Sequence, residues 1–299
     1  MQRMKQMQAV RLVQKGTKAA EVELQSESLP IPGQHQLLIK VYAASLNYRD
    51  LALLRGEYRA ELDRVGFSID GMLSEYAVFY EDAIVRIPGY LSYVEAASLP
   101  CAAVTAWVGL NKIEPLQPGH TVLIQGTGGV SLFALQFSKI LGVRVLAITS
   151  SDTKAAKLKE LGADAVVNYS SHPEWDREIL ALTDGEGVDR VLDIAGEKTI
   201  VKSGASTRIG GVVVVIGFAS GFGGRLPPID ILTRNLTVTG SSIGSRLDFE
   251  AMLAAIARHE TRPVIDQVYP LAEYREAYRK LESGQQVGKV VIEVTQTAV

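Results

Sequence analysis

The sequence predicts an α/β fold in which a doubly wound parallel sheet is joined to a domain rich in β-strands. Two observations predict it. Between residues 121 and 240, short apolar runs alternate with segments of helical spacing, which is typical of a parallel sheet covered by helices on both faces. Residues 8–46 instead have strand composition, broken by Pro30, Pro32 and Gly33. A chain of 299 residues is long enough for two such domains.

The expected elements follow from the hydrophobic pattern. Before residue 112, strands are expected at 9–13, 37–43, 73–79 and 83–87, and a helix over 91–110 is interrupted at Pro100 and capped by Ser92 with Glu95. The parallel sheet is expected to take strands at 122–124, 143–148, 166–167, 188–194, 211–217 and 236–240. One helix is expected to follow the first of these strands and to end at Leu141. Further helices are expected at 152–161, 174–182, 249–258 and 271–282. Extended segments are expected at 264–269 and 289–294.

Composition excludes several classes of protein. Thirty-one basic against 33 acidic residues give a net charge of −2, so neither a nucleic acid nor a membrane surface is expected as a partner. Cys101 is the single cysteine, which excludes an internal disulfide and fits a reducing compartment. The start of the sequence has no apolar core of signal-peptide length, and no apolar run reaches the length of a membrane span. We therefore expect a soluble cytoplasmic protein.

A glycine-rich turn follows the first strand of the parallel sheet. Gly126, Gly128 and Ser131 give the pattern G-x-G-x-x-S between an apolar strand and a helix. Glycines let the main chain approach a pyrophosphate, and the following helix directs its unpaired N–H groups at the anion. A tight turn before a buried helix has purely structural uses as well. With the strand–helix alternation, the turn predicts a dinucleotide-binding domain at 113–260, inserted into a domain formed by 1–112 with 261–299.

The end of the second parallel strand indicates which dinucleotide binds. A domain specific for NAD usually carries Asp or Glu there, bound to the ribose 2′-hydroxyl. Here Ser150 and Ser151 follow the strand, with Lys154 close behind and Tyr169 just after the third strand. Hydroxyls and a lysine suit the 2′-phosphate of NADP. Ser151 could instead be a simple helix cap and Lys154 a solvated charge. The missing acid favours NADP(H).

Two common catalytic arrangements are missing from the sequence. A zinc-dependent alcohol dehydrogenase needs cysteine and histidine ligands, but none of the four histidines, at 35, 120, 172 and 259, has a suitable spacing to another ligand. A short-chain reductase needs a Tyr-x-x-x-Lys pair, and none of the 11 tyrosines has a lysine four residues later. We therefore expect no metal site.

Seven stretches resemble, in order, the zinc-independent branch of the medium-chain dehydrogenase/reductase family, close to its quinone oxidoreductase-like and alcohol dehydrogenase-like members. They are SLNYRDL (45–51), DGMLSEYAV (70–78), EAASLPCAAVTAW (95–107), VLIQGTGGVSLFALQFSK (122–139), LGADAVVNY (161–169), GVDRVLDIAG (187–196) and GKVVIEV (288–294). The resemblance implies a GroES-like domain and a Rossmann domain, bound NAD(P)H, a small-molecule substrate, and a homodimer joined through the edges of the Rossmann sheets.

The resemblance also implies roles for individual residues. Asn47 is similar to an asparagine near the nicotinamide and substrate, and Tyr58 to a tyrosine that binds the substrate or donates a proton to it. Thr105, Gly217, Phe218 and the pair at 241–242 are similar to residues around the nicotinamide. The expected cofactor site is Thr105, Gly126, Thr127, Gly128, Gly129, Val130, Ser131, Ser150, Ser151, Lys154, Tyr169, Gly217, Phe218, Ser241, Ser242 and Lys289.

The chain departs from the family pattern between Tyr58 and the DGMLSEY stretch. Family members usually have a long segment there, with a glycine- and acid-rich turn and two strands, whereas here residues 61–65 run directly into 66–70. The GroES-like domain is therefore expected to be truncated. Two functions stay open: an NADPH-dependent reductase of a carbonyl or activated alkene (quinone, enone or enoyl type), and an NADP-binding protein with impaired catalysis.

Overall fold

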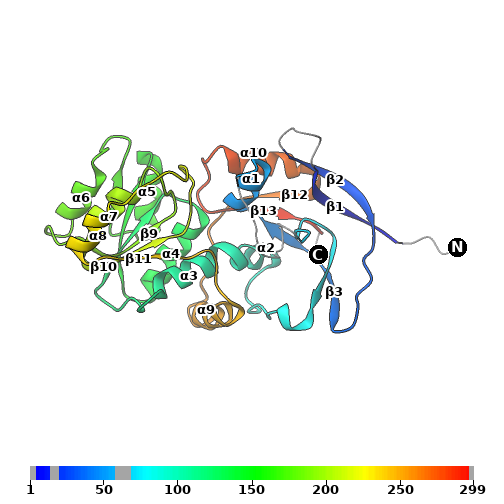
Figure 1. Cartoon of the computed structure of the whole chain (residues 1–299). Coiled ribbons are helices and arrows are strands. Elements are labelled where there is room, and N and C mark those ends of the chain that lie inside the picture. Colours follow the sequence, from blue (N-terminus) through cyan, green and yellow to red (C-terminus); the bar gives the residue numbers. More distant parts are fainter. Residues whose placement is uncertain (1–4, 14–19, 58–68, 296–299) are drawn as a thin grey trace. The chain divides into compact units, whose positions relative to one another are not determined.

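The computed structural model describes residues 5–13, 20–57 and 69–295 and divides into two compact units (Figure 1). Unit 1 consists of Met1–Pro100 and Ile265–Val299, and unit 2 is Cys101–Val264. The domain limits expected near residues 112 and 261 stay a prediction. Among the described residues, no helix has both the length and the apolarity that crossing a bilayer requires.

Unit 2 is built on a six-stranded sheet in which every neighbouring pair is parallel. The spatial order is β11-β10-β9-β6-β7-β8. The predicted α/β fold with a doubly wound parallel sheet is confirmed. The strands are β6 (Thr121–Gln125), β7 (Arg144–Thr149), β8 (Ala165–Asn168), β9 (Val188–Asp193), β10 (Thr207–Val215) and β11 (Thr237–Gly240).

Helices connect these strands, and their apolar sides form the core with the sheet. All five residues of β6 are buried, as expected for a strand covered on both faces. The short helices α7 and α8 are missing from the sequence prediction because glycine, serine and β-branched residues give them weak intrinsic propensity. The helices are α3 (Val104–Asn111), α4 (Gly129–Ile140), α5 (Asp152–Glu160), α6 (Trp175–Ala181), α7 (Ile200–Ser206), α8 (Pro228–Arg234) and α9 (Arg246–Arg258).

The described residues of unit 1 form three small sheets. One is the antiparallel pair of β1 (Gln6–Val13) and β2 (Glu21–Ser28), and another is the antiparallel pair of β3 (Gln36–Lys40) and β5 (Tyr76–Tyr80). In the third sheet, β13 (Lys289–Glu293) lies between β12 (Ile265–Pro270) and β4 (Ala43–Ser45). Two strands that follow unit 2 in the sequence thus form a sheet with a strand that precedes it.

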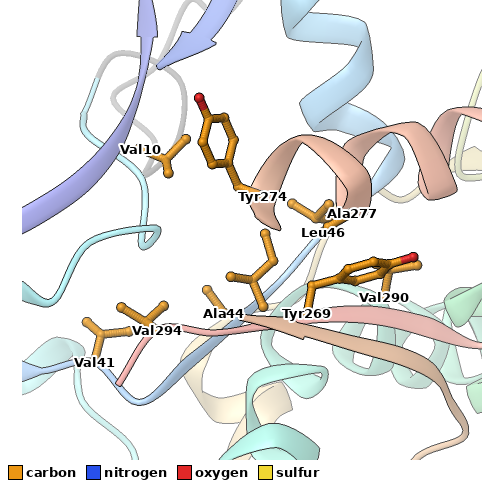
Figure 2. Close-up of a cluster of buried hydrophobic side chains, with 10 residues drawn as sticks. Val10, Val41, Ala44, Leu46, Tyr269, Tyr274, Ala277, Val290 and Val294 are labelled. Atoms are coloured by element: carbon orange, nitrogen blue, oxygen red, sulfur yellow. The ribbon is translucent and has the colours of Figure 1, made fainter. Parts of the chain in front are cut away.

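The core of unit 1 joins this third sheet to a helix that follows β12. In Figure 2, Tyr274 and Ala277 on α10 (Tyr274–Glu282) lie over strand residues that include Ala44 and Val290. Each large apolar side chain in such a cluster stabilises the fold by about 1.5–3 kcal/mol. The remaining helical elements of unit 1 are α1 (Tyr48–Leu54), α2 (Tyr93–Ala97) and two 3₁₀ turns, Glu81–Ala83 and Leu271–Glu273.

Two sequence predictions in unit 1 are wrong in detail. The strand expected at 37–43 is two strands, because β3 pairs with β5 whereas β4 pairs with β13. The strand expected at 83–87 is absent, because the 3₁₀ turn Glu81–Ala83 ends β5 and the apolar residues that follow find no pairing strand before Pro88. Apolar composition alone does not make a strand without a partner.

The helix expected at 91–110 is three consecutive pieces: α2, a π-helical turn at Leu99–Ala103 and α3. Pro100 lies in the π-helical turn, so the expected interruption is confirmed. The capping box at the start of α2 is also confirmed. Ser92 N donates to Glu95 Oε2 at 2.8 Å, and Glu95 N donates to Ser92 Oγ at 3.2 Å.

Arg190 on β9 is a buried cation that the sequence analysis does not single out. Its guanidinium donates to the carbonyl oxygens of Gly109 (3.1 Å), Leu110 and Glu114 (2.7 Å), at and just after the last turn of α3. Burial lowers the pKa of Arg190 to about 10, so the side chain stays charged at neutral pH. A cation at the C-terminus of a helix satisfies its last carbonyls and its dipole.

Replacing Arg190 by methionine is therefore expected to lower the free energy of unfolding of unit 2 by about 3 kcal/mol, because three carbonyl groups lose a charged donor. Urea unfolding followed by tryptophan fluorescence measures this, since Trp107 and Trp175 both belong to unit 2. The control is Arg208→Met, which removes a half-exposed ion pair to Asp189 and should cost under about 1 kcal/mol. Equal losses for the two variants would contradict the role given to Arg190.

Candidate functional site

The strand order of unit 2 reverses direction beside β6, which makes a topological switch point in the sheet. The chain runs outward from β6 through β7 to β8, then returns to β9 on the other side of β6 and continues to β10 and β11. At such a switch point the loops after the strands diverge, and ligands bind outside the carboxyl ends of the strands. We call the loops there the carboxyl edge, defined by residues 126–131, 149–154, 169, 193–199, 217–218 and 241–242.

Almost all of the expected cofactor residues lie at this edge. The glycine turn follows β6, Ser150 and Ser151 follow β7, and Tyr169 follows β8. The pairs 217–218 and 241–242 come after β10 and β11. Thus the fold brings together segments up to 116 positions apart in the sequence because their strands are parallel neighbours in one sheet.

The glycine turn itself is rigid. Gly126 has φ +74°, and Gly128 is the N-cap of α4 with φ −74°. Ser131 in the first turn of α4 is buried and donates its hydroxyl to Gln125 O at 2.6 Å. The serine at the third position of the fingerprint therefore fastens the helix to the end of β6, where a third glycine would only allow close packing.

The two glycines have different reasons to be glycine. A Cβ on Gly126 or on Gly128 would meet no protein atom within 4 Å. Gly126 is nevertheless required by the fold, because its positive φ disfavours L-residues by roughly 1–2 kcal/mol. Gly128 has an ordinary backbone conformation, so nothing in the described part of the protein requires glycine there. Its small size matters only for something that approaches this turn from outside.

The end of β7 carries hydroxyl groups and no acid. Thr149 is its last residue, and Ser151 caps α5 by accepting from Lys154 N at 3.3 Å. The nearest carboxylate, Asp152, accepts from the Asn168 side chain at 2.8 Å. The expectation that β7 ends without Asp or Glu is confirmed. The cap predicted for Ser151 as the alternative is present too, and it is compatible with ligand binding at the outer surface of the same turn.

Two buried hydroxyls at the carboxyl edge lack hydrogen-bond partners among the residues that the structure describes. They are Thr149 Oγ1 at the end of β7 and Ser241 Oγ directly after β11. Buried polar groups are nearly always hydrogen-bonded, and an exception costs about 1–3 kcal/mol. Both atoms thus mark positions at which a polar ligand would complete the hydrogen bonding.

A buried carboxylate connects the two strands beside the switch point. Asp193, the last residue of β9, accepts from Gly196 N (2.8 Å) and Thr199 Oγ1 (2.9 Å) through Oδ1. Its Oδ2 accepts from Ser203 Oγ at 2.6 Å and from Gln125 Nε2 at 3.4 Å. The sequence analysis misses this network. The sequence offers one indication of it: a polar residue ends an otherwise apolar strand, as Gln125 also does in β6.

The loop after β10 packs closely on the loop after β9. A Cβ on Gly217 would lie 2.5 Å from Ile194 O, so only glycine fits this approach. The ring of Phe218 stacks on that of Phe222 with centroids 4.3 Å apart. Thr105 is buried on α3, the helix whose end Arg190 caps. The loops after β9 and β10 are thus packed against each other at the carboxyl edge.

In unit 1, the structure brings two of the expected site residues into direct contact. Lys289 is buried on β13, and its Nζ donates to Asn47 Oδ1 at 2.7 Å and to Leu46 O at 2.5 Å. Asn47 is also the N-cap of α1, and its main-chain N donates to Asp50 Oδ2 at 2.7 Å. Burial raises the pKa of the Asp50 carboxyl, against the opposing effects of this hydrogen bond and of Lys289. Tyr58 lies outside the described residues.

Among residues 5–13, 20–57 and 69–295, no group of three or more histidine, cysteine or acidic side chains could hold a metal ion. His35 lies near Glu81 on the surface, and His120 accepts from Gln117 N in a turn. Both have ordinary structural partners.

Comparison with known proteins decides the family. A family model for the zinc-binding dehydrogenase domain matches residues 129–258. The zinc-type alcohol dehydrogenase-like protein of Schizosaccharomyces pombe is 34% identical over 330 aligned residues, which cover 91% of this chain and 95% of that protein. The chain belongs to the medium-chain dehydrogenase/reductase family. The resemblance inferred from the seven sequence stretches is thereby confirmed at the level of the family.

Solved structures of similar proteins span nearly all of this medium-chain dehydrogenase/reductase. An NAD-dependent alcohol dehydrogenase superposes with a TM-score of 0.86 at 28% identity, covering 97% of this chain and 100% of that one. The quinone oxidoreductase of Thermus thermophilus, also solved as a complex with NADPH, has a TM-score of 0.82 at 28% identity. The superposition covers 96% of this chain and 100% of the Thermus thermophilus chain. The names of these two proteins give different dinucleotides and different substrates. The shared fold therefore determines neither the dinucleotide nor the substrate of this chain.

The carboxyl edge fits a nicotinamide dinucleotide on its own geometry. It has an open glycine turn at the start of a 12-residue helix, which suits a pyrophosphate. It also has two buried hydroxyls that need partners. The residues present at the carboxyl edge thus fit a dinucleotide, and its assignment to them is part of the proposal below.

The variant Gly128→Ser tests this site. Serine is a good N-cap, and a Cβ at this position meets no protein atom within 4 Å, so the melting temperature should stay within about 2 °C of the wild-type value. The side chain would obstruct the approach of a pyrophosphate, and the Kd for NADPH in a fluorescence titration should rise about tenfold or more.

Gly126→Ala is the matched comparison for Gly128→Ser. Its positive φ predicts a loss of about 1–2 kcal/mol in stability. Wild-type NADPH affinity in Gly128→Ser would contradict the assignment of this turn to the dinucleotide.

Proposed function

We propose that this protein is an NADPH-dependent, zinc-independent reductase that transfers a hydride to a carbonyl or activated alkene, quinones, enones and enoyl compounds included. Family membership establishes the coarser function, NAD(P)-dependent oxidoreduction. The observation that carries the finer proposal is the carboxyl edge, where an open glycine turn stands beside a strand end that has hydroxyls and no acid.

Different residues of unit 2 would bind different parts of the dinucleotide. The glycine turn and the N-terminus of α4 would bind the pyrophosphate through main-chain N–H groups. Ser150, Ser151 and Lys154 would bind the 2′-phosphate, with Tyr169 beside the adenosine. The nicotinamide end would be held by main chain and side chains after β10 and β11. The proposed cofactor residues there and along the turn are Thr105, Gly126, Thr127, Gly128, Gly129, Val130, Ser131, Gly217, Phe218, Ser241 and Ser242.

When bound, the cofactor supplies the hydride, and the protein supplies position and polarisation. Negative charge develops on the oxygen of a carbonyl, quinone or enone as the hydride is accepted. Preorganised donors that face this oxygen lower the barrier, and removing one such donor typically costs about 10²–10³ in kcat. Asn47 and Tyr58 are the residues proposed to bind the substrate oxygen. Tyr58 is in addition the proposed proton donor.

Catalysis without zinc is part of the proposal, although the matching family model and the yeast relative carry zinc in their names. Catalytic zinc sites use three protein ligands drawn from cysteine, histidine and acidic residues. The described residues assemble no such group. The donors assigned to the substrate oxygen are an amide and a phenol, which polarise it without a metal.

A second candidate function, NADP binding with impaired catalysis, is favoured by the short segment after Tyr58. The alignment with the yeast relative extends over 330 positions, although this chain contributes only 91% of its 299 residues. The alignment therefore contains gaps on the side of this chain, which supports a shortened domain. A GroES-like domain that lacks strands would bind substrate less completely, and the protein would then bind NADP without efficient turnover.

The quaternary state and location are proposals of the same kind. β11 is an edge strand of the six-stranded sheet, with its outer hydrogen-bonding groups available for pairing. A homodimer joined through this edge would cover it. The absence of a basic excess and of paired cysteines fits a cytoplasmic enzyme.

Purified protein titrated with NADPH and then mixed with a panel of quinones and enones tests the proposed function. NADPH should bind, and absorbance at the reduced nicotinamide band should fall with at least one acceptor. Binding without turnover on any acceptor would support the impaired protein and exclude the reductase. Binding of NADH but not NADPH would exclude the cofactor assignment.

Lys154→Ala tests the choice between the two dinucleotides. It should weaken NADPH binding about tenfold and leave NADH binding unchanged, because only NADPH carries the 2′-phosphate. Lys157→Ala, on the same helix with an ion pair to Glu160, is the matched control and should change neither affinity. A Lys154→Ala variant with unchanged preference for NADPH would contradict the role of Lys154.

A further inference from the structure

We infer that Lys289 is a positioning residue that fixes the side chain of Asn47 as a hydrogen-bond donor, so that the ligand atom facing Asn47 must be a hydrogen-bond acceptor, which in the proposed substrates is an oxygen. This inference rests on the proposed function for the identity of the substrate, but its geometry does not. The resemblance to the family assigns Lys289 to cofactor binding instead. The contacts of unit 1 favour the positioning role.

The orientation of an asparagine amide follows from its partners, because its oxygen and nitrogen have similar shapes. The ammonium of Lys289 can only donate, so the Asn47 atom 2.7 Å from it must be the oxygen. The carbonyl oxygen of Ser45 can only accept, so the atom 3.1 Å from it must be the nitrogen. Two independent partners thus require the same orientation of the amide.

Lys289 is itself held in place, which makes the orientation firm. It is 4% exposed, lies at the start of β13 and also donates to Leu46 O, next to Asn47. β13 is the central strand of its sheet, paired with both β12 and β4. A buried ammonium with fixed acceptors cannot turn away without losing its charge-assisted hydrogen bonds. Asn47 Oδ1 is therefore occupied by the protein.

What Asn47 can offer to a ligand follows directly. The nitrogen Nδ2 carries two N–H groups and donates one of them to Ser45 O. The other is directed by the same planar amide and is the remaining polar function of the side chain. A donor of this kind stabilises an oxygen that gains negative charge, as in the reduction of a ketone, quinone or enone. A hydroxyl that must donate its proton finds no acceptor at Asn47.

Lys289→Met and Asn47→Ala, combined in a double-mutant cycle, test the inference. Asn47→Ala should lower kcat with a quinone or enone by about 100-fold, and Lys289→Met should lower it about tenfold through loss of orientation. In the Asn47→Ala background, Lys289→Met should lower kcat less than about twofold. A further tenfold loss in that background would show that Lys289 acts independently of Asn47 and would overturn the inference.

Binding measurements separate positioning from the alternative roles of Lys289. The Kd for NADPH should be unchanged in Lys289→Met, and a weakened Kd with unchanged kcat would make Lys289 a cofactor-binding residue. Lys280→Met is the matched control, since Lys280 is paired with Asp266 in the same unit, and it should leave kcat unchanged. A general effect of removing a lysine from unit 1 would lower kcat in both variants.

Asn47→Asp gives an answer even if Lys289→Met does not fold. Aspartate keeps an oxygen toward Lys289 but replaces the donating nitrogen with a second acceptor. It should therefore lose at least as much kcat as Asn47→Ala. An Asn47→Asp variant with wild-type kcat would show that no donor is needed and would overturn the inference.

A failure of the proposed function is distinguishable from a failure of this inference. If the wild-type protein binds NADPH but reduces no acceptor, the ¹H–¹⁵N resonances of the Asn47 side-chain amide, assigned by their loss in Asn47→Ala, supply the readout. Lys289→Met should shift these resonances and speed their exchange with water. Unchanged resonances would overturn the inference, whereas altered resonances would support it without any turnover.

Discussion

The structure of unit 2 depends on one buried carboxylate, that of Asp193. Its two oxygens accept hydrogen bonds from the start of the β9–α7 loop, from Thr199, from Ser203 on α7 and from Gln125 at the end of β6. A buried charge is tolerated only when it is fully hydrogen-bonded. Because Gln125 in turn accepts from Ser131, at its main-chain oxygen, the same network reaches the first turn of α4. The loops on both sides of the switch point are thus positioned together.

This coupling explains how a glycine turn that resembles the dinucleotide fingerprint keeps its shape without the third glycine. Ser131 donates its hydroxyl to the main chain of β6, and the turn remains open above Gly126 and Gly128. Local hydrogen bonds therefore fix the shape, while small residues leave the approach clear. The same division holds at the other strand ends: Gly217 is required by a neighbouring main chain, whereas Thr149 and Ser241 have buried hydroxyls that the described protein leaves without a partner.

Most of the fold could be predicted from the sequence because its signals are local. Strands such as β6 are continuous apolar runs, and the Ser92 cap is a pattern of four residues. The strand expected at 83–87 is wrong because a strand also needs a partner, which composition does not reveal. The site could be predicted only in part. The glycine turn and the acid-free end of β7 can be recognised in the sequence. The hydrogen bonds of Arg190 and Asp193 and the contact between Lys289 and Asn47 join residues that are separated along the sequence, so no local pattern predicts them.

The position of β13 has a consequence for how the protein is made. Asn47 and Lys289 are 242 residues apart, and β4 pairs with a strand that leaves the ribosome after the whole of unit 2. During synthesis, unit 2 is complete while the sheet of β4, β12 and β13 still lacks two of its three strands. Domains generally fold as units as they emerge. The amide of Asn47 therefore acquires its fixed orientation only after unit 2 has been made in full, and the unit that begins first along the chain is the last to be finished.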